Sequence, residues 1–389
     1  MDRYDSIVVG LGAMGSAAVR HLAKSGVRVL GIDRFRPPHA LGSTHGDTRI
    51  TRLAIGEGEH YTPLAMRSHE LWRELERETG TSLLTCNGGL VISSPTKTSI
   101  NHVENFFENT VAAARRFGIA HELLDASAIR RRFPAFNVGD DEYGYFEPSA
   151  GFVRPEACVA AHLAMAARDG AAIRPDEQVQ GFDASDAGVT VRTDLGAYHA
   201  DRMILSTGAW IPGFVGPEVA RHFRIFRQTL FWFDVPDAAA NYRPENFPIF
   251  IWELQHRMQG IYGFPAIDGA GGGLKIGAEH YDATTSADAI ERTVTPAEIE
   301  HMHARFVAPF LPGLGARCVR TAVCLYTVTP DFGFVIDRHP ASERVLIVSP
   351  CSGHGFKHSA AIGEALAQVV VDGASRLDLS GFRLARFDA

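Results

Sequence analysis

Residues 7–33 read IVVGLGAMGSAAVRHLAKSGVRVLGID. An apolar run leads into glycines at positions 10, 12 and 15, and a helix-compatible segment, a second apolar run and Asp33 follow. In a strand–helix–strand unit with this spacing, Gly10 permits a tight turn, Gly12 lets a pyrophosphate approach the backbone, and Gly15 lets helix and strand pack closely. The stretch predicts a dinucleotide site, and the plainer alternative is a glycine-rich turn in an ordinary α/β unit.

The residues that follow these glycines favour the dinucleotide site. The helix start at 13–16 offers free N–H groups and a positive dipole end to a phosphate. Asp33 lies about 20 residues further on, where a carboxylate accepts the ribose hydroxyls. From this stretch we expect the cofactor contacts Gly10, Gly12, Ala13, Met14, Gly15 and Asp33.

Length and composition indicate a globular protein with one large domain or two. The chain has 389 residues, of which 46% are hydrophobic and 21% charged. No apolar run approaches the roughly 18 residues that a membrane span needs, and the N-terminal strand leaves no room for a signal peptide, so we expect a cytoplasmic protein without a membrane partner. The net charge of −7 argues against a nucleic-acid partner. The cysteines form no C-x-x-C pair, which fits a reducing compartment and argues against a metal site.

The order of the predicted elements indicates a discontinuous architecture. Segments of α/β character occur at both ends and in the middle, whereas 226–281 alternates apolar and polar residues as an antiparallel sheet does. We predict an α/β (α+β) fold with two parts: a Rossmann-like dinucleotide domain of the glutathione-reductase type and a catalytic domain with a large antiparallel sheet. The expected ranges are 1–85, 148–218 and 320–389 for the first domain, which includes Gly208, and 86–147 and 219–319 for the second. This pattern disfavours a plain NAD dehydrogenase, whose dinucleotide domain is contiguous.

Two loops concentrate positive charge. The first holds His45, Arg49 and Arg52, and arginine forks bind carboxylates or phosphates. The alternative is that nearby acids neutralise these arginines in surface ion pairs; the candidates are Asp47, Glu57 and Glu59.

The second loop reads CSGHGFK at 351–357, where Gly353 and Gly355 let backbone amides face a ligand. The helix start that follows adds partial positive charge, which suits an electron-rich ring. The alternative is a simple strand-to-helix turn with a solvated Lys357.

Lys275 lies in the alternating stretch GGGLKIGAEH. Strands place every second side chain on the same face, so this lysine points either inward or outward. An inward lysine must be paired or functional, whereas an outward one is only solvated, which is the commoner arrangement. Cys324 is uninformative by itself, since most lone cysteines are small buried hydrophobes.

Taken together, the stretches VVGLGAMGSAA, HGDTR, FEPSAGF, IYGFP, GLKIG, CLYTVTPDFGFVID and SGHGFK resemble the monomeric sarcosine oxidase and N-methyltryptophan oxidase family, within the D-amino acid oxidase superfamily. The resemblance covers nearly the whole chain. It implies a monomer that uses FAD to oxidise an N-methyl amino acid. Oxygen would be the acceptor, and the products would be the demethylated amino acid, formaldehyde and hydrogen peroxide.

The resemblance also assigns roles to single residues. Cys324 matches the cysteine that binds the flavin through a thioether, and Lys275 matches the oxygen-activating lysine. Arg52 and Lys357 match the pair that grips the substrate carboxylate, which would orient the substrate for hydride transfer.

Three further matches complete the expected site. His45 and Arg49 match residues that tune the flavin, and Tyr262 matches an active-site tyrosine. A cationic ring stabilises an anionic reduced flavin; its expected members are His45, Arg49, Arg52, Lys275 and Lys357.

Some positions depart from the family. Sarcosine oxidases carry a histidine four residues after the oxygen-activating lysine, where this chain has Glu279, followed by His280. Thr44 and Cys351 stand where relatives often have histidine and an aromatic residue. The reaction class is unaffected, but the side-chain specificity stays open: sarcosine, N-methyltryptophan and cyclic amines such as pipecolate are all candidates.

Two alternatives to an oxidase remain. A dehydrogenase of the same fold would pass its electrons to a quinone or another protein. A non-enzymatic dinucleotide-binding protein would give no reason for Cys324, Arg52 and Lys357 to occur together.

Overall fold

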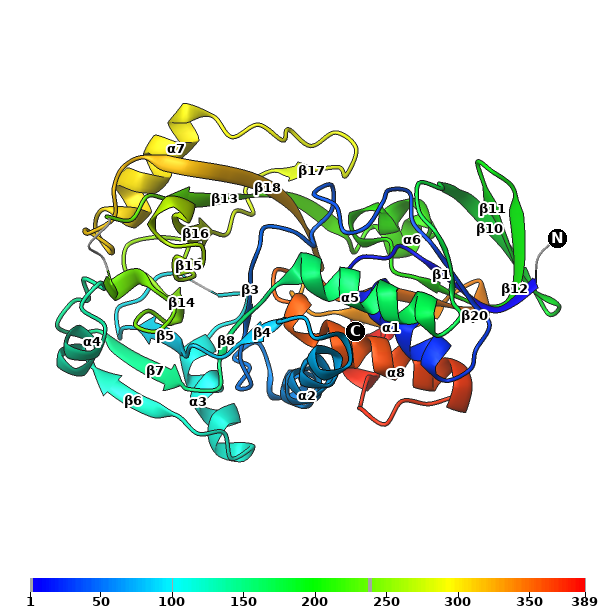
Figure 1. The fold of residues 1–389 in the computed structure, drawn as a ribbon, viewed down its shortest axis with the longest axis horizontal. Helices are drawn as coiled ribbons and strands as arrows, with labels where there is room; N and C mark the ends of the chain where they lie inside the picture. The colour runs from blue at the N-terminus through cyan, green and yellow to red at the C-terminus, as the bar shows by residue number, and fades with distance from the viewer. Residues whose placement is uncertain (1–2, 100, 237–239, 389) are drawn as a thin grey trace.

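The computed structural model describes residues 3–99, 101–236 and 240–388. Figure 1 shows two halves side by side, one built on a parallel sheet with α1, α5 and α8 and the other on a large sheet with α3, α4 and α7. This mixed α/β arrangement confirms the predicted fold class. No helix in the described ranges is both long and apolar enough to cross a bilayer.

The N-terminal stretch forms the predicted strand–helix–strand unit from β1 (Arg3–Val9), α1 (Ala13–Lys24) and β2 (Val29–Ile32). β1 pairs in parallel with β2 on one side and with a strand almost 200 residues later on the other, so that Val9 lies opposite Ile32 and Leu205. Five strands pair in parallel in the order β9-β2-β1-β12-β20, and β19 adds an antiparallel edge to β20. The antiparallel hairpin of β10 (Val179–Ser185) and β11 (Gly188–Thr193) pairs with the first residues of β12. The added strands are β9 (Ala172–Arg174), β12 (Ala197–Leu205), β19 (Val335–His339) and β20 (Ser342–Ser349).

Apolar helix faces cover this sheet. α1 contacts both α5 (Pro155–Arg168) and α8 (Ser359–Asp372), and α2 (Thr62–Thr79) packs on α8 and α5. Their shared core includes the fully buried Val19, Trp72 and Leu366. The helices fix the carboxyl ends of the parallel strands, where open α/β sheets bind ligands.

The second half is built on a mostly antiparallel sheet in the order β17-β13-β16-β15-β14-β5-β7-β6, with β18 on the other side of β13. The β14–β5 pair is parallel. The strands are β5 (Gly89–Ser93), β6 (Glu122–Asp125), β7 (Tyr143–Glu147), β13 (Arg224–Phe233), β14 (Ile249–Trp252), β15 (Ile261–Gly263), β16 (Leu274–Ala278), β17 (Thr284–Thr285) and β18 (Cys318–Val328). The helices are α3 (Phe106–Arg116), α4 (Ala126–Arg132) and α7 (Pro296–Met302).

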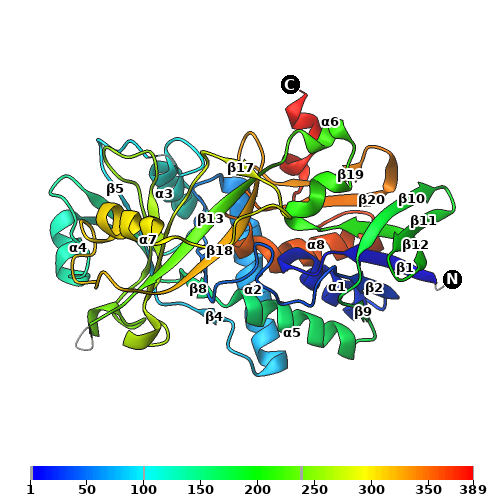
Figure 2. The same ribbon diagram turned by 90° about the horizontal axis from the view of Figure 1, so that it is seen from above.

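Strand pairing crosses one of the predicted domain boundaries. The boundary between 319 and 320 falls inside β18, which pairs with β13 over the whole of Arg224–Phe233. Figure 2 shows β13 and β18 as a long pair that runs from beside α7 towards the middle of the molecule. Cys324, opposite Gln228 in this pair, therefore lies on the sheet of the second half.

A small sheet lies between the halves. It contains β3 (Arg49–Thr51), β8 (Gly151–Val153) and β4 (Leu84–Thr85) in that order. β3 carries the first of the two charged loops into the interior.

Candidate active site

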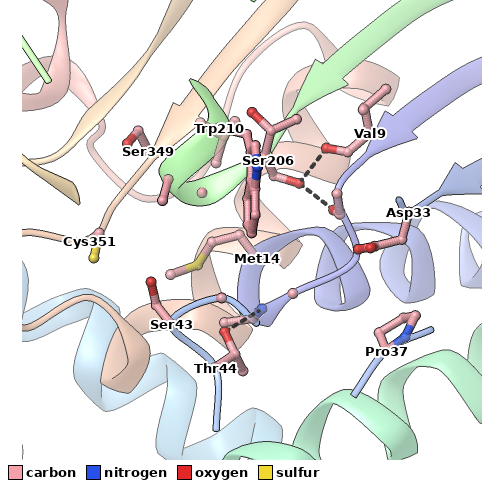
Figure 3. Close-up of a pocket in the computed structure, with 18 of the residues that line it drawn as sticks. Val9, Met14, Asp33, Pro37, Ser43, Thr44, Ser206, Trp210, Ser349 and Cys351 are labelled. Carbon is pink, nitrogen blue, oxygen red and sulfur yellow. Dashed lines mark hydrogen bonds between the residues drawn. The ribbon is translucent and has the colours of Figure 1, made fainter. Parts of the chain in front are cut away.

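A first cavity follows the carboxyl ends of β1 and β2 and the start of α1 (Figure 3). Most of the predicted cofactor contacts line it: Gly10, Gly12, Ala13, Met14, Asp33, Gly208, Gly353 and Gly355. Segments from the beginning, middle and end of the chain thus meet here. We call it the cofactor cavity.

The three glycines of the N-terminal stretch, at positions 10, 12 and 15, have different structural roles. Gly10 has a φ of +86°, and a Cβ there would lie 2.5 Å from the carbonyl oxygen of Ser206. A Cβ on Gly15 would overlap the carbonyl oxygen of Gly10, so Gly15 serves helix–strand packing and does not line the cavity. A Cβ on Gly12 would meet only Thr44 Oγ1, at 3.5 Å. Gly12 therefore leaves space for a ligand, whereas the other two allow close packing.

The start of α1 can bind an anion. Gly12 is the N-cap and provides no side-chain cap, the first turn carries no acid, and the Ala13 N–H donates to Thr44 Oγ1 at 3.4 Å. Helix N–H groups without intrahelical partners suit a phosphate. Asp33 accepts from the N–H groups of Leu11 (2.7 Å) and Phe35 (2.8 Å), and each carboxylate oxygen has a further lone pair for a ribose hydroxyl. The donor set fits a dinucleotide.

Sequence reasoning missed part of this cavity. Ser43, Thr44, Val179, Trp210 and Ser349 also line it. Figure 3 shows Trp210 and Met14 close to the start of α1, with the Ser206 hydroxyl donating to the carbonyls of Val9 and Gly10. These lining residues come from separate strands and loops and share no motif, so no sequence signal singles them out.

A second cavity adjoins the first. Arg49, Tyr326, Gly353 and Phe356 line both, so the two cavities meet at these residues. The predicted site residues Tyr262, Lys275, Cys324 and Lys357 line the second, together with Glu57, His102, Glu279 and His354. We call it the substrate cavity.

Lys275 points inward from β16. Its Nζ donates to the carbonyls of Gly46 (2.7 Å) and Thr48 (2.8 Å) and to Thr48 Oγ1 (3.2 Å). Burial lowers the pKa of Lys275 well below its ordinary value, and Arg49 adds to the effect. Of the two orientations that the sequence left open, the paired inward one is correct.

Arg49 and His45 differ in charge. Arg49 donates to the carbonyls of Ser43 (2.6 Å) and Thr48 (2.9 Å), and within the described ranges it has no carboxylate partner. His45 is buried, and this burial together with Arg49 lowers its pKa to about 3, so it is neutral at pH 7. The expectation that His45 contributes a positive charge to a cationic ring is therefore wrong. Neither cavity is lined by His45.

Arg52 forms a buried ion pair with Glu57. Its Nη2 lies 2.5 Å from Glu57 Oε2, and its guanidinium carbon lies 4.8 Å from the centre of the Phe106 ring. Lys357 Nζ lies 3.3 Å from the other oxygen of Glu57 and donates to the carbonyl of His354 at 2.8 Å. Lys357 lines the substrate cavity, whereas Arg52 does not. Glu57 thus lies between the two expected carboxylate-binding cations.

The charges in this group are mutually dependent. Burial alone would raise the pKa of Glu57, but Arg52 and Lys357 outweigh it and hold that pKa well below its ordinary value. Burial lowers the pKa of Lys357 to about 8 against the opposing effect of Glu57. Of the acids expected to neutralise the arginines, Glu57 does so in the interior, whereas Asp47 pairs with Arg320 and Glu59 with Arg116.

His102 connects Glu57 to Glu279. Its Nε2 lies 2.9 Å from Glu279, and its Nδ1 lies 3.7 Å from Glu57. Burial opposes protonation of His102, but the two carboxylates raise its pKa to about 9. Glu57, His102 and His354 have the spacing of a metal site, yet Arg52 and Lys357 already neutralise the carboxylate. We therefore assign no metal.

Cys324 is buried and carries a free thiol at the wall of the substrate cavity. Burial raises its pKa, while Arg49 and Lys275 oppose the rise. Tyr262 is half-buried against β16, where a Cβ on Gly277 would lie 2.8 Å from its ring. A thiol, a tyrosine and the three basic side chains of Arg49, Lys275 and Lys357 therefore line one cavity.

Comparison with known proteins agrees with this geometry. The chain matches the family described as FAD dependent oxidoreductase (DAO) over residues 5–369. A monomeric sarcosine oxidase of Streptomyces avermitilis is 40% identical over 371 residues, which cover 95% of this chain and 94% of that protein. An N-methyl-L-tryptophan oxidase of Salmonella dublin is 35% identical over 387 residues, covering 99% of each chain.

Solved structures share the fold. NikD, described as an unusual amino acid oxidase essential for nikkomycin biosynthesis, superposes with a TM-score of 0.84 at 24% identity and covers 98% of both chains. An L-proline dehydrogenase from P. horikoshii gives a TM-score of 0.81 at 21% identity, covering 100% of this chain and 98% of that one. With a family match over almost its whole length and full-length relatives above 30% identity, the chain belongs to the DAO family of FAD-dependent oxidoreductases.

Proposed function

We propose that this enzyme oxidises the secondary amine of an N-methyl amino acid and releases the demethylated amino acid, formaldehyde and hydrogen peroxide. One observation carries the proposal: Lys357, Lys275 and Cys324 line the substrate cavity, which meets the cofactor cavity. The names of the relatives, sarcosine oxidase and N-methyl-L-tryptophan oxidase, support it. We expect a monomer, as the name of the sarcosine oxidases indicates.

The residues of both cavities would hold the cofactor. Gly12 and the start of α1 would bind its pyrophosphate, Asp33 would bind the ribose, and Cys324 would form a thioether to the ring. When bound, FAD supplies a hydride acceptor for the amine and an electron donor for O2.

The substrate carboxylate would bind to Lys357 and Arg52 next to Glu57 and would leave Glu57 in place. The buried group of Arg52, Lys357, protonated His102, Glu57 and Glu279 carries one excess positive charge, which the added carboxylate balances. Charge-assisted contacts to two cations fix the orientation of the substrate. The N-methyl carbon would then lie towards the junction of the two cavities.

The cations would also control protons. An amine carbon loses hydride only when its nitrogen is unprotonated, and positive charges at Lys357 and Arg49 disfavour a bound ammonium. The Lys275 ammonium, held by the carbonyls of residues 46 and 48, would stabilise negative charge as it develops on oxygen.

A peroxide-release assay across N-methyl amino acids and cyclic secondary amines tests the proposal. We expect stoichiometric peroxide with at least one N-methyl amino acid, sarcosine included in the panel. Substrate-dependent bleaching of the flavin without peroxide in air would favour a dehydrogenase instead. A preference for pipecolate over every N-methyl substrate would favour a cyclic imino acid oxidase.

A further inference from the structure

One wall of the substrate cavity carries an acid that the proposed reaction does not use. Glu279 follows β16 directly, and side chains alternate along a strand, so Glu279 faces the cavity from the same side as Lys275. The intervening position on that face is Gly277, over which the Tyr262 ring lies. His280, the next residue, does not line the cavity.

Several neighbours fix the Glu279 carboxylate through one of its oxygens. Oε2 accepts from the Tyr281 hydroxyl at 2.8 Å and lies 2.9 Å from His102 Nε2. The backbone of His280 is clamped by Gln228, which accepts from its N–H (2.9 Å) and donates to its carbonyl (2.6 Å). The segment therefore has little freedom to turn away from the cavity.

The other oxygen of Glu279 remains available. Within the described part of the chain, Oε1 has no hydrogen-bond donor, although the side chain is only 14% exposed. Both ring nitrogens of the neighbouring His102 likewise lack a well-oriented hydrogen bond among the described residues. Oε1 is not among the fully buried polar atoms, so a ligand in the cavity can reach it. A carboxylate oxygen at the wall of a cavity is a strong acceptor for a donor on the substrate.

Charge decides what kind of donor suits this oxygen. The groups linked to Glu279 by ion pairs are Glu57, His102, Arg52 and Lys357. His354 also lies 3.7 Å from Glu57, but burial lowers its pKa well below the ordinary value. Arg49 and Lys275 line the cavity outside this network and donate to backbone carbonyls. With His102 protonated, the three cations exceed the two carboxylates by one positive charge, which the carboxylate of an amino acid would balance. A second charge of either sign on the substrate would disturb this balance, whereas a neutral donor would not.

We propose that Glu279 forms a side-chain subsite that accepts a hydrogen bond from a neutral donor on the substrate, such as a carboxamide, a hydroxyl or a ring N–H. The subsite rests on the proposed function, because it discriminates among substrates of that reaction. It favours N-methyl amino acids with such a side chain over apolar ones and excludes those with an acidic side chain.

Three substrates of nearly equal shape test the subsite: N-methyl-L-asparagine, N-methyl-L-leucine and N-methyl-L-aspartate, with sarcosine as the reference. We expect kcat/KM for the asparagine derivative to be at least ten times that for the leucine derivative. It should also be at least a hundred times that for the aspartate derivative. In Glu279→Gln, whose amide both donates and accepts, the asparagine-to-aspartate ratio should fall at least tenfold. His280→Gln, one residue away, is the matched control and should keep all ratios.

Two outcomes would overturn the subsite: equal kcat/KM for the asparagine and leucine derivatives, or an unchanged asparagine-to-aspartate ratio in Glu279→Gln. The wild-type ranking decides the matter if that variant does not fold. Turnover of sarcosine without turnover of the asparagine derivative would also overturn the subsite and leave the proposed function standing. Absence of turnover with every N-methyl amino acid of the peroxide panel would overturn both.

Discussion

The cofactor cavity and the substrate cavity of this enzyme are lined by different kinds of groups. The cofactor cavity has glycines at several of its turns, and its anion site is the start of a helix. The substrate cavity is formed by buried charged side chains from segments up to 300 residues apart, as the Glu57–Lys357 pair shows. Backbone requirements act locally and leave a motif, whereas a buried charge network depends on tertiary packing.

The largest expected effect concerns the residue that would join the cavities. Cys324→Ala should abolish the acid-stable yellow colour of the precipitated protein, because no other thiol lines the substrate cavity within the described ranges. Cys351→Ala is the control, since Cys351 lines the cofactor cavity and should not form the link. Wild-type protein that loses its colour to the supernatant would refute the thioether.

Substitution by alanine distinguishes Gly15, which is needed for packing, from Gly12, which faces the cofactor cavity. Gly15→Ala should give little folded protein, because its Cβ overlaps the backbone at Gly10. Gly12→Ala should fold but bind FAD poorly, since its Cβ meets only open space beside Thr44. Thermal unfolding and the flavin-to-protein absorbance ratio measure the two effects. Equal FAD content in Gly12→Ala and wild type would argue against a pyrophosphate at this turn.

Lys275→Met tests the proposed role of the Lys275 ammonium in the reaction with O2. Removing one preorganised electrostatic contact costs about 10²–10³ in rate, and we expect this loss in reoxidation by O2, with a much smaller change in reduction by substrate. Stopped-flow measurement separates the two half-reactions. Equal losses in both would remove Lys275 from the oxygen reaction.

Lys357→Met should raise KM about tenfold to a hundredfold, because a hydrogen bond to a charged group is worth roughly 1.5–3 kcal/mol. Arg52→Met should also raise KM, and it should destabilise the fold further by leaving Glu57 with one cation fewer in the interior. Steady-state kinetics and thermal melts check both variants. An unchanged KM in Lys357→Met would exclude it from carboxylate binding.

The smallest expected effect is the pH dependence of carboxylate binding. Because the pKa of Lys357 is lowered to about 8, its ammonium is present below pH 8 and is lost as the pH rises further. The inhibition constant of propionate, which carries no amine of its own, should therefore increase above pH 8 by up to about tenfold per pH unit. Lys357→Arg keeps its charge and should remove this rise; a rise at the same pH in that variant would point to another group.

The cofactor cavity could be predicted because its rules are local. Gly10, Gly12 and Asp33 lie within one strand–helix–strand unit, and each has a steric or electrostatic reason to be there. Lys275 shows the limit of such reasoning: strand alternation allows two orientations, and only the packing of β16 against the loop at 46–48 selects the inward one.

The charge network was predicted only in part. Glu57 was expected as a surface partner of an arginine but forms its pair in the interior, since burial depends on the packing of Phe106 over Arg52. The imidazole of His45 was expected to be positively charged, but burial and the neighbouring Arg49 lower its pKa and keep it neutral. His102 belongs to no motif, because its partner Glu279 follows a strand far along the chain.

The long pair of β13 and β18 has a mechanical consequence. Cys324 belongs to the sheet of one half, whereas the glycine turn at 10–15 belongs to the sheet of the other. A cofactor fixed at both places would act as a brace across the joint between the halves, so that neither half could move without straining it. With FAD bound, the two halves should therefore unfold in one thermal transition. In Cys324→Ala, which lacks the covalent link, they should unfold in two separate transitions.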